Sequence, residues 1–310
     1  MAIESKDIAR ARLEAIDNSL GRIYGIPTPF DKKGKAYALP YESTFVELLL
    51  SQWGKATSSA VRKALKILHA RTGEVSDREV KAVLDQVDTQ INMQFPAGVE
   101  PVVPDLMKKS YRKGRDPIFR KHRIKVVWDQ PDIEAIDWLT DHHMYWIGGY
   151  YDKHVSASIA DTIAEGMTQG LGRNDIGKSL KTFFDDYPGV ANKPDSYWRG
   201  MAANGMNRSR NFGLIHGYEE VEVDILVVMA VMDERTSEVC REMNGREIPV
   251  VRAAKQRDSI MAAKKPEDIK ELAPWPALES IKGKATSTIL SSGVVMPPYH
   301  FHCRTTVVEK

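Results

Sequence analysis

The two cysteines of this 310-residue chain, Cys240 and Cys303, both lie in its C-terminal part. Cys240 follows the stretch Asp233-Glu234-Arg235-Thr236-Ser237, and Cys303 stands in the ending Pro297-Pro298-Tyr299-His300-Phe301-His302-Cys303-Arg304. Thiols, imidazoles, charged residues and a Pro-Pro pair in this order favour a region with one defined fold. Two distant segments must meet for that fold to form, and this requirement constrains the chain more than any other feature.

Composition excludes several classes of protein. A hydrophobic content of 42% is enough to bury a core. The net charge of +2, from 44 basic and 42 acidic residues, gives no overall attraction to nucleic acid or to an anionic membrane, so any DNA contact has to be local. The longest apolar run, Ile225–Met232, is too short to span a bilayer, and no membrane segment is expected.

The first residues and the cysteine content predict where the chain is made. Acidic residues stand where a secretory signal would need an apolar core, so export is not expected. Two cysteines provide no disulfide framework. The chain is therefore expected to be made and kept in a reducing cytoplasm.

Residues 1–125 are predicted to form a helical region with Pro/Gly-rich and basic linkers. Apolar residues at a period of 3.6 predict a helix over residues 4–20, and prolines and glycines predict a loop or extended arm from Gly21 to Pro40. Further helices are predicted over residues 42–53, 58–71 and 77–93. Ser76 caps the last of these, with Glu79 three residues on.

A basic run from Lys108 to Lys125 has ten Lys, Arg or His residues in eighteen positions and also contains Tyr111 and Phe119. One interpretation is a solvated hinge between two domains. The other is a local nucleic-acid contact, in which cations pair with phosphates and the aromatic rings stack on bases. The cations proposed for that contact are Arg112, Lys113, Arg115 and Lys121.

Residues 126–218 are predicted to form a central helical region. Helices are expected from residue 132, from about residue 150 to a stop at Gly170-Leu171-Gly172, from a cap at Asn174 or Asp175, and over Asp195–Tyr218. Three histidines are expected to be polar-face or packing residues rather than metal ligands: His142, His143 and His154. A polar cluster on the last helix favours an interface or solvated face, with a phosphate site as the alternative: Asn204, Asn207, Arg208, Arg210 and Asn211.

Residues 219–310 are predicted to form an α+β module. Strands are expected over Ile225–Met232, Glu247–Val251, Gly293–Met296 and Thr305–Val308. A short helix over Glu238–Met243, capped by Asp233, Thr236 or Ser237, should stop at Asn244-Gly245, and a charged helix is expected within Pro266–Leu272. Pro297-Pro298 is expected to form an edge turn that presents His300.

The order Asp-x-Arg-Thr-Ser, a Cys three residues on, a Gly, and finally Pro-Pro-x-His-x-x-Cys-Arg resembles the Mu F-like head morphogenesis proteins of tailed bacteriophages. The resemblance covers roughly residues 130–308, and the first 125 residues resemble no family. The signature residues that carry it are Asp233, Arg235, Thr236, Gly245, Pro298 and Arg304.

The helical patterns predict mainly α N-terminal and central regions, and the resemblance implies that a C-terminal α+β Mu F-like module follows them. It also implies a non-enzymatic minor head protein, present in few copies, that associates with the phage portal and assists head assembly, DNA packaging or ejection. The scaffold and the major capsid protein are further candidate partners. The expected location is the virion or procapsid interior, after synthesis in the bacterial host cytoplasm.

The chemistry of the module stays open among three interpretations. Cys240, His300 and Cys303 can hold zinc, with His302 as a candidate fourth ligand. Some Mu F-like relatives carry further cysteines where this chain has Ser237 and Thr305, which leaves this chain three comfortable ligands.

In the second interpretation Cys240 is a nucleophile with His300 as its base, in a Cys/His hydrolase or nuclease-like effector delivered with the genome. In the third, both cysteines are buried apolar residues and no cofactor is bound. Asp233, Arg235 and Arg304 then form a charged network that fixes the strand ends.

Overall fold

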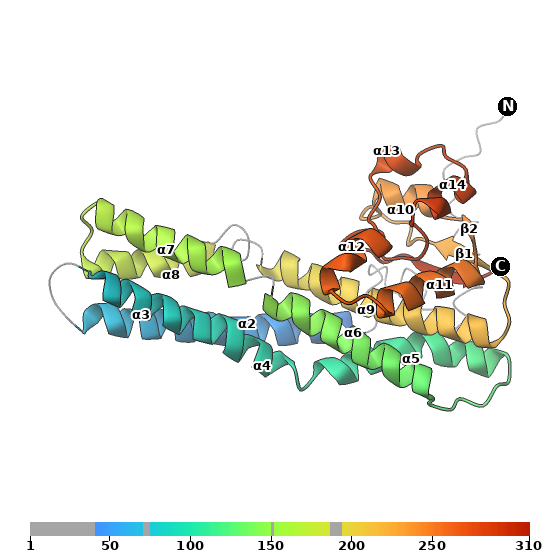
Figure 1. Ribbon diagram of the computed structural model, residues 1–310, viewed down its shortest axis with the longest axis horizontal. Coiled ribbons are helices and arrows are strands. Elements are labelled where there is room, and N and C mark those ends of the chain that lie inside the picture. The colour runs from blue at the N-terminus through green and yellow to red at the C-terminus, as the bar shows by residue number, and fades with distance from the viewer. Residues whose placement is uncertain (1–40, 71–74, 150–151, 187–193) are drawn as a thin grey trace. The chain divides into compact units, whose positions relative to one another are not determined.

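The computed structural model describes residues 41–70, 75–149, 152–186 and 194–310 (Figure 1). The helix predicted over residues 4–20 and the arm from Gly21 to Pro40 lie outside these residues. The described chain is mostly helical, with a small three-stranded antiparallel sheet near its C-terminal end. This confirms the prediction of a mainly α chain that ends in a smaller α+β part. No helix among the described residues combines the length and the apolar character needed to cross a membrane.

The chain divides into two compact units, which are treated separately. The helical unit consists of Glu42–Leu106 and Asp137–Ala202, and the C-terminal unit contains Met107–Ile136 and Ala203–Lys310. The helices up to residue 220 are α2 (Glu42–His69), α3 (Asp77–Asp88), the π-helix η1 (Thr89–Gln94), α4 (Phe95–Val99), α5 (Val103–Lys121), α6 (Gln130–Gly149), α7 (Asp152–Thr168), α8 (Arg173–Asp186) and α9 (Pro194–Glu220). The later elements are β1 (Ile225–Met229), α10 (Glu238–Met243), β2 (Glu247–Pro249), α11 (Val250–Met261), the 3-10 helix η2 (Pro266–Asp268), α12 (Ile269–Leu272), α13 (Leu278–Ile281), α14 (Thr286–Ser291) and β3 (Thr306–Glu309).

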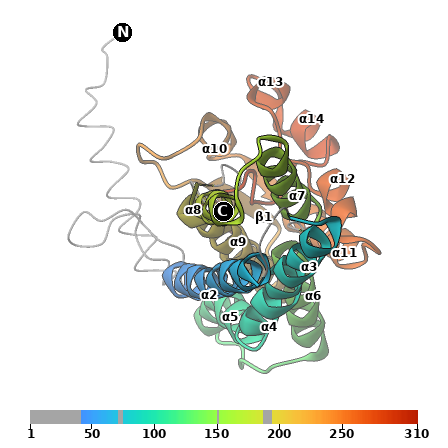
Figure 2. The ribbon, with the colours of Figure 1, turned by 90° about the vertical axis from the view of Figure 1, so that its left-hand side faces the viewer.

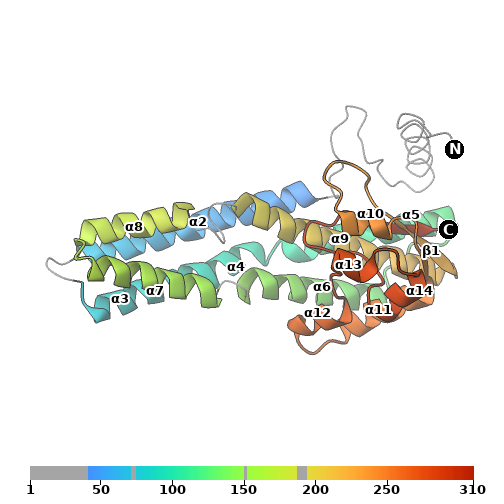
Figure 3. The ribbon, with the colours of Figure 1, turned by 90° about the horizontal axis from the view of Figure 1, so that it is seen from above.

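In the helical unit, α2 packs against α3 and α8, and α7 packs against α3 and α8 (Figures 2 and 3). The two helices predicted over residues 42–53 and 58–71 are one continuous helix. The reason is that buried Trp53, Ala56 and Ala60 carry the 3.6-residue period straight through the expected break.

One charged cluster joins three helices of this unit. Ser76 N–H donates to Glu79 Oε2 at 3.0 Å, which confirms the predicted capping box at the start of α3. Arg173 donates to both oxygens of Glu79, at 2.8 and 3.1 Å, and to the Leu68 carbonyl at 3.0 Å. The hydrogen bonds from Arg173 hold the pKa of Glu79 well below its usual range.

In the C-terminal unit, α5 and α9 touch through their backbones. A Cβ added at Gly213 would stand 2.1 Å from the Tyr111 carbonyl oxygen, and one at Gly114 would stand 2.1 Å from the Arg210 carbonyl oxygen. Only glycine permits this approach. Ser110 also donates to the Met206 carbonyl at 2.8 Å. Residues later in α5 contact residues later in α9, so the two helices run parallel where they touch.

The sheet has the order β2-β1-β3, with both neighbours antiparallel to β1. Leu226 pairs with Ile248 on one side and with Glu309 on the other. The strand predicted over Gly293–Met296 is wrong. Gln256 of α11 donates to the Gly293 carbonyl at 2.5 Å and accepts from Met296 N–H at 2.9 Å, so a side chain takes the place of a strand partner. The strand predicted over Glu247–Val251 ends at Pro249, where α11 begins.

Candidate functional site

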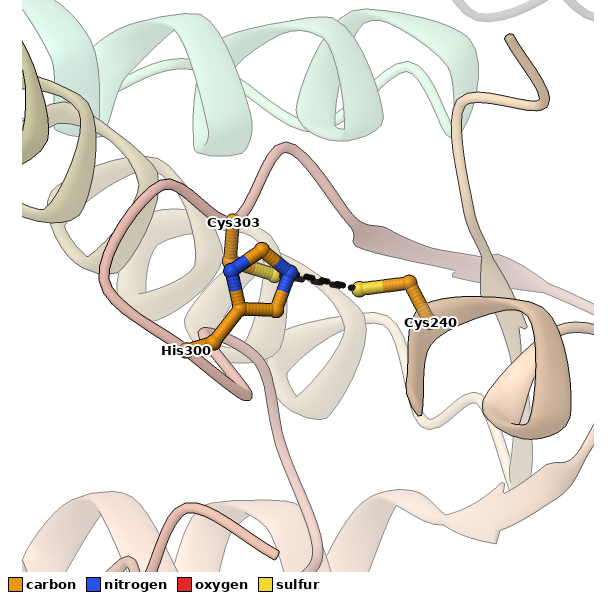
Figure 4. Close-up of side chains that lie close together, drawn as sticks. All are labelled: Cys240, His300 and Cys303. Carbon is orange, nitrogen blue, oxygen red and sulfur yellow. Dashed lines mark hydrogen bonds between the residues drawn. The ribbon is translucent and has the colours of Figure 1, made fainter. Parts of the chain in front are cut away.

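The structure brings Cys240, His300 and Cys303 together, as Figure 4 shows. Cys240 Sγ lies 3.1 Å from His300 Nε2 and 3.7 Å from Cys303 Sγ. Both cysteines are buried and reduced, whereas His300 is partly exposed. His302, the candidate fourth ligand, has an exposed side chain and does not belong to the group of ligand atoms found among the described residues.

Local sequence explains the position of Cys240. The hydroxyl of Ser237 caps α10 and accepts from Cys240 N–H at 3.2 Å, so Cys240 lies in the first turn of that helix. The prediction of a helix over Glu238–Met243 is confirmed, and Ser237 is the cap. Ser237 and Thr305 also lower the pKa of the Cys240 thiol, so both positions adjoin this cluster.

The two thiols differ in acidity. The hydrogen bond from Cys303, followed by that from His300, lowers the pKa of Cys240. Burial raises the pKa of Cys303 well above its ordinary value. Cys240 is therefore the more acidic thiol of the pair, and it bonds with Cys303 and faces an imidazole. A thiolate in this position can bind a metal or act as a nucleophile.

The Asp233–Arg304 ion pair lies in the same module. Arg304 donates to both oxygens of Asp233, at 2.6 and 2.5 Å, and both side chains are nearly buried. These hydrogen bonds lower the pKa of Asp233. Arg235 was predicted to belong to this charged network. Its side chain is exposed, however, and only its backbone N–H donates to Asp233, at 3.0 Å.

The other signature residues shape the backbone. Thr236 Oγ1 accepts from Asp233 N–H at 2.8 Å and bonds with the Val231 carbonyl, which closes the loop before α10. Gly245 has a φ of 78° and donates its N–H to the Val228 carbonyl at 2.8 Å. Pro298, two residues before His300, is buried.

Two asparagines of α9 hold the segment that contains Cys303. Asn207 donates to the carbonyl oxygens of Cys303 and Thr305, at 2.8 and 2.9 Å. Asn211 accepts from the Thr306 hydroxyl at 3.1 Å. An interface, a solvated face or a phosphate site was predicted for this polar cluster, but four of its members are buried and the two asparagines are internal supports: Asn207, Arg208, Arg210 and Asn211. The i, i+4 spacing of two asparagines was the available signal.

The basic run is neither a hinge nor a stacking platform. Residues 108–121 of it lie in α5, where Tyr111, Arg115 and Phe119 are buried. Arg115 pairs with Asp116 and Asp132. The proposed nucleic-acid contact therefore loses Arg115 and both rings. Exposed Arg112, Lys113 and Lys121 remain candidates, with Lys121 Nζ 2.5 Å from Glu309 Oε2.

The histidines of α6 occupy packed positions in the helical unit. His142 and His143 are buried, and the His142 ring stacks on Trp138 with centroids 4.8 Å apart. The side chain of His154 lies outside the described residues. Packing roles were predicted for these histidines, and the surroundings of His142 and His143 are of that kind.

No protein-family model, no curated protein and no solved structure matches this chain. The likeness to Mu F-like head morphogenesis proteins therefore rests on the signature residues.

Proposed function

We propose that this protein is a bacteriophage minor head protein that associates with the portal and assists head assembly, DNA packaging or ejection without catalysing a reaction. The observation that carries the proposal is the direct pairing of the two separated signature segments. Asp233 bonds with Arg304, and Cys240 bonds with His300 and Cys303. A motif whose members bond with one another over such a separation supports a role in defining a fold.

The direction of these contacts favours a binding module over an enzyme. Asp233 and Thr236 make their hydrogen bonds inside the module, and Asn207 of α9 donates to its backbone. A module fixed by internal charged contacts suits repeated docking on a symmetric ring such as a portal. The scaffold and the major capsid protein are further candidate partners, and the virion or procapsid interior is the proposed location.

Co-purification with the portal protein of the same phage tests this proposal. The chain is co-expressed with a tagged portal, and the complex is isolated at moderate salt. We expect retention of the parent chain and loss of retention for Asp233→Asn, which opens the ion pair. Glu234→Gln, at the exposed neighbouring position, is the matched control and should be retained. A parent chain that never binds the portal contradicts the proposal.

Within this module, Cys240, His300 and Cys303 are proposed to hold zinc. Two thiolates at about 2.3 Å from one tetrahedral zinc ion lie about 3.8 Å apart, and the observed Sγ–Sγ distance is 3.7 Å. Thiolate and imidazole are also the donors that zinc prefers. Zinc at this position would link α10 to the C-terminal segment, since its ligands come from both.

Metal content measured on the purified chain tests the zinc site. We expect close to one zinc per chain and a lower unfolding temperature after chelation, because zinc bound by the folded state stabilises it. Cys303→Ala should remove both effects. A chain that contains no zinc, takes none up and is unaffected by a chelator leaves the three residues as a hydrogen-bonded core.

The second candidate function is a Cys/His hydrolase or a nuclease-like effector. The 3.1 Å contact of Cys240 with His300, together with the lowered pKa of Cys240, favours it. Cleavage of peptide, DNA or RNA that disappears in Cys240→Ala and His300→Ala would support catalysis. If both variants change only stability, the structural role is supported.

A further inference from the structure

A second group of metal-ligand side chains lies in the C-terminal unit and plays no part in the proposed function. It consists of Asp129, Asp132 and His216, and one ligand atom of each lies within 4.8 Å of the others. Asp132 and His216 are buried, and Asp129 is partly exposed. The group thus has a buried floor and one side that reaches solvent.

One oxygen of Asp132 is left without a hydrogen bond. Its Oδ2 pairs with Arg115 and accepts from Asp129 N–H at 3.2 Å. Its Oδ1 is buried, receives no hydrogen bond and lies 3.3 Å from His216 Nδ1. A buried carboxylate oxygen without a donor costs free energy, so a positive group is expected beside it.

His216 does not supply that positive group. Its Nδ1 lies 2.6 Å from the Tyr111 hydroxyl. The hydroxyl can donate to Nδ1, and the imidazole then offers its Nδ1 lone pair. Asp132 Oδ1 and His216 Nδ1 are then two electron-pair donors that face each other.

We propose that Asp129, Asp132 and His216 bind a divalent cation, with Asp132 Oδ1 and His216 Nδ1 as neighbouring ligands. Ligand atoms about 2.0–2.2 Å from one ion lie about 2.8–3.6 Å apart in octahedral or tetrahedral geometry, and the 3.3 Å between these two atoms falls in that range. Binding exchanges the Tyr111 hydrogen bond for a metal–nitrogen bond.

Local charge favours this cation. Arg115 is already shared between Asp116 and Asp132. Asp129 is left as the carboxylate for the ion, and Glu220 Oε1 lies 3.8 Å from His216 Nε2 at the exposed rim. Two carboxylates and one imidazole suit the class of ions that includes Mn²⁺, Fe²⁺ and Zn²⁺.

Mn²⁺ binding to the chelator-treated full chain tests this site by electron paramagnetic resonance. Mn²⁺ prefers oxygen and imidazole ligands over thiolates, so it discriminates against the Cys240 cluster. We expect one bound Mn²⁺ per chain and at least tenfold weaker binding in Asp129→Asn. Asp129 is partly exposed, so its isosteric change should leave the fold intact, which circular dichroism checks. Asp137→Asn, an exposed position on α6, is the matched control and should bind like the parent.

Two further variants locate the ion. Cys240→Ser should bind Mn²⁺ normally, because the thiolate is not a ligand of this site. Tyr111→Phe removes the competing hydroxyl and should keep or raise the affinity. The proposal is overturned if the parent binds no Mn²⁺, if Asp129→Asn binds as tightly as the parent, or if Cys240→Ser abolishes binding.

Discussion

Asn207 of α9 donates to the carbonyl oxygen of Cys303 at 2.8 Å. A helix almost a hundred residues earlier in the chain thus holds the segment that carries His300 and Cys303. The same amide group donates to the Thr305 carbonyl at 2.9 Å. The contact is buried, so a lost donor leaves both carbonyl oxygens unpaired in the interior. The position of Cys303 therefore depends on α9 as well as on its own loop.

Asn207→Ala should reduce the free energy of unfolding by about 2–3 kcal/mol, because two buried carbonyl oxygens lose their donor. Chemical denaturation measures this change. Asn204→Ala, one turn earlier on α9 and only partly buried, should change the free energy of unfolding much less. Similar losses in both variants would show that the Cys303 and Thr305 contacts contribute little.

Two helical glycines should respond to alanine in opposite directions, because one lies at the α5–α9 contact and the other does not. Gly213→Ala should cost about 3 kcal/mol, since the new Cβ meets the Tyr111 carbonyl oxygen. Gly54→Ala, in α2 of the helical unit, meets no atom within 4 Å and should stabilise by up to about 1 kcal/mol. Calorimetric unfolding of both variants tests the close approach. A neutral Gly213→Ala would contradict it.

Asp233→Asn should destabilise the chain by about 3 kcal/mol at neutral pH, because Arg304 is left nearly buried without its counter-charge. The folded pKa of Asp233 lies below its unfolded value, so the pair stabilises the fold above the unfolded pKa and loses this effect as the pH falls through the folded pKa. The difference between parent and variant should therefore shrink below about pH 4. Urea denaturation at pH 7 and at pH 3 measures it, and a pH-independent difference would mean that the charge is not the cause.

Thr305→Cys should strengthen zinc binding at least tenfold, since the Thr305 side chain lies near enough to lower the pKa of both cysteines and a thiol there supplies a fourth ligand. Competition with a chromophoric chelator measures the affinity. Ser291→Cys, exposed on α14, adds a thiol away from the ligands and serves as the control. Equal affinities in the two variants would place the ion elsewhere.

The parts of the fold that the sequence predicts well are those set by neighbouring residues. The bounds of α10 follow from the Ser237 cap and the Asn244-Gly245 stop, and the helix predicted over Asp195–Tyr218 corresponds to α9. The sequence also predicts that Cys240, His300 and Cys303 meet, because the only two cysteines of the chain lie in the same C-terminal region as His300.

The parts that could not be predicted depend on partners far away in the chain. Nothing near Gly293 shows that the Gln256 side chain replaces a strand there. Burial of Asn207 and of Arg115 runs against the usual exposure of polar residues, and it is explained only by partners in other segments.

The central claim is that this chain occupies the portal vertex of a phage head. Quantitative mass spectrometry of purified procapsids, assembled with and without the portal protein, tests it most directly. The account predicts a few copies of the chain in portal-containing particles and none in portal-free particles. Equal amounts in both, or none in either, would contradict it.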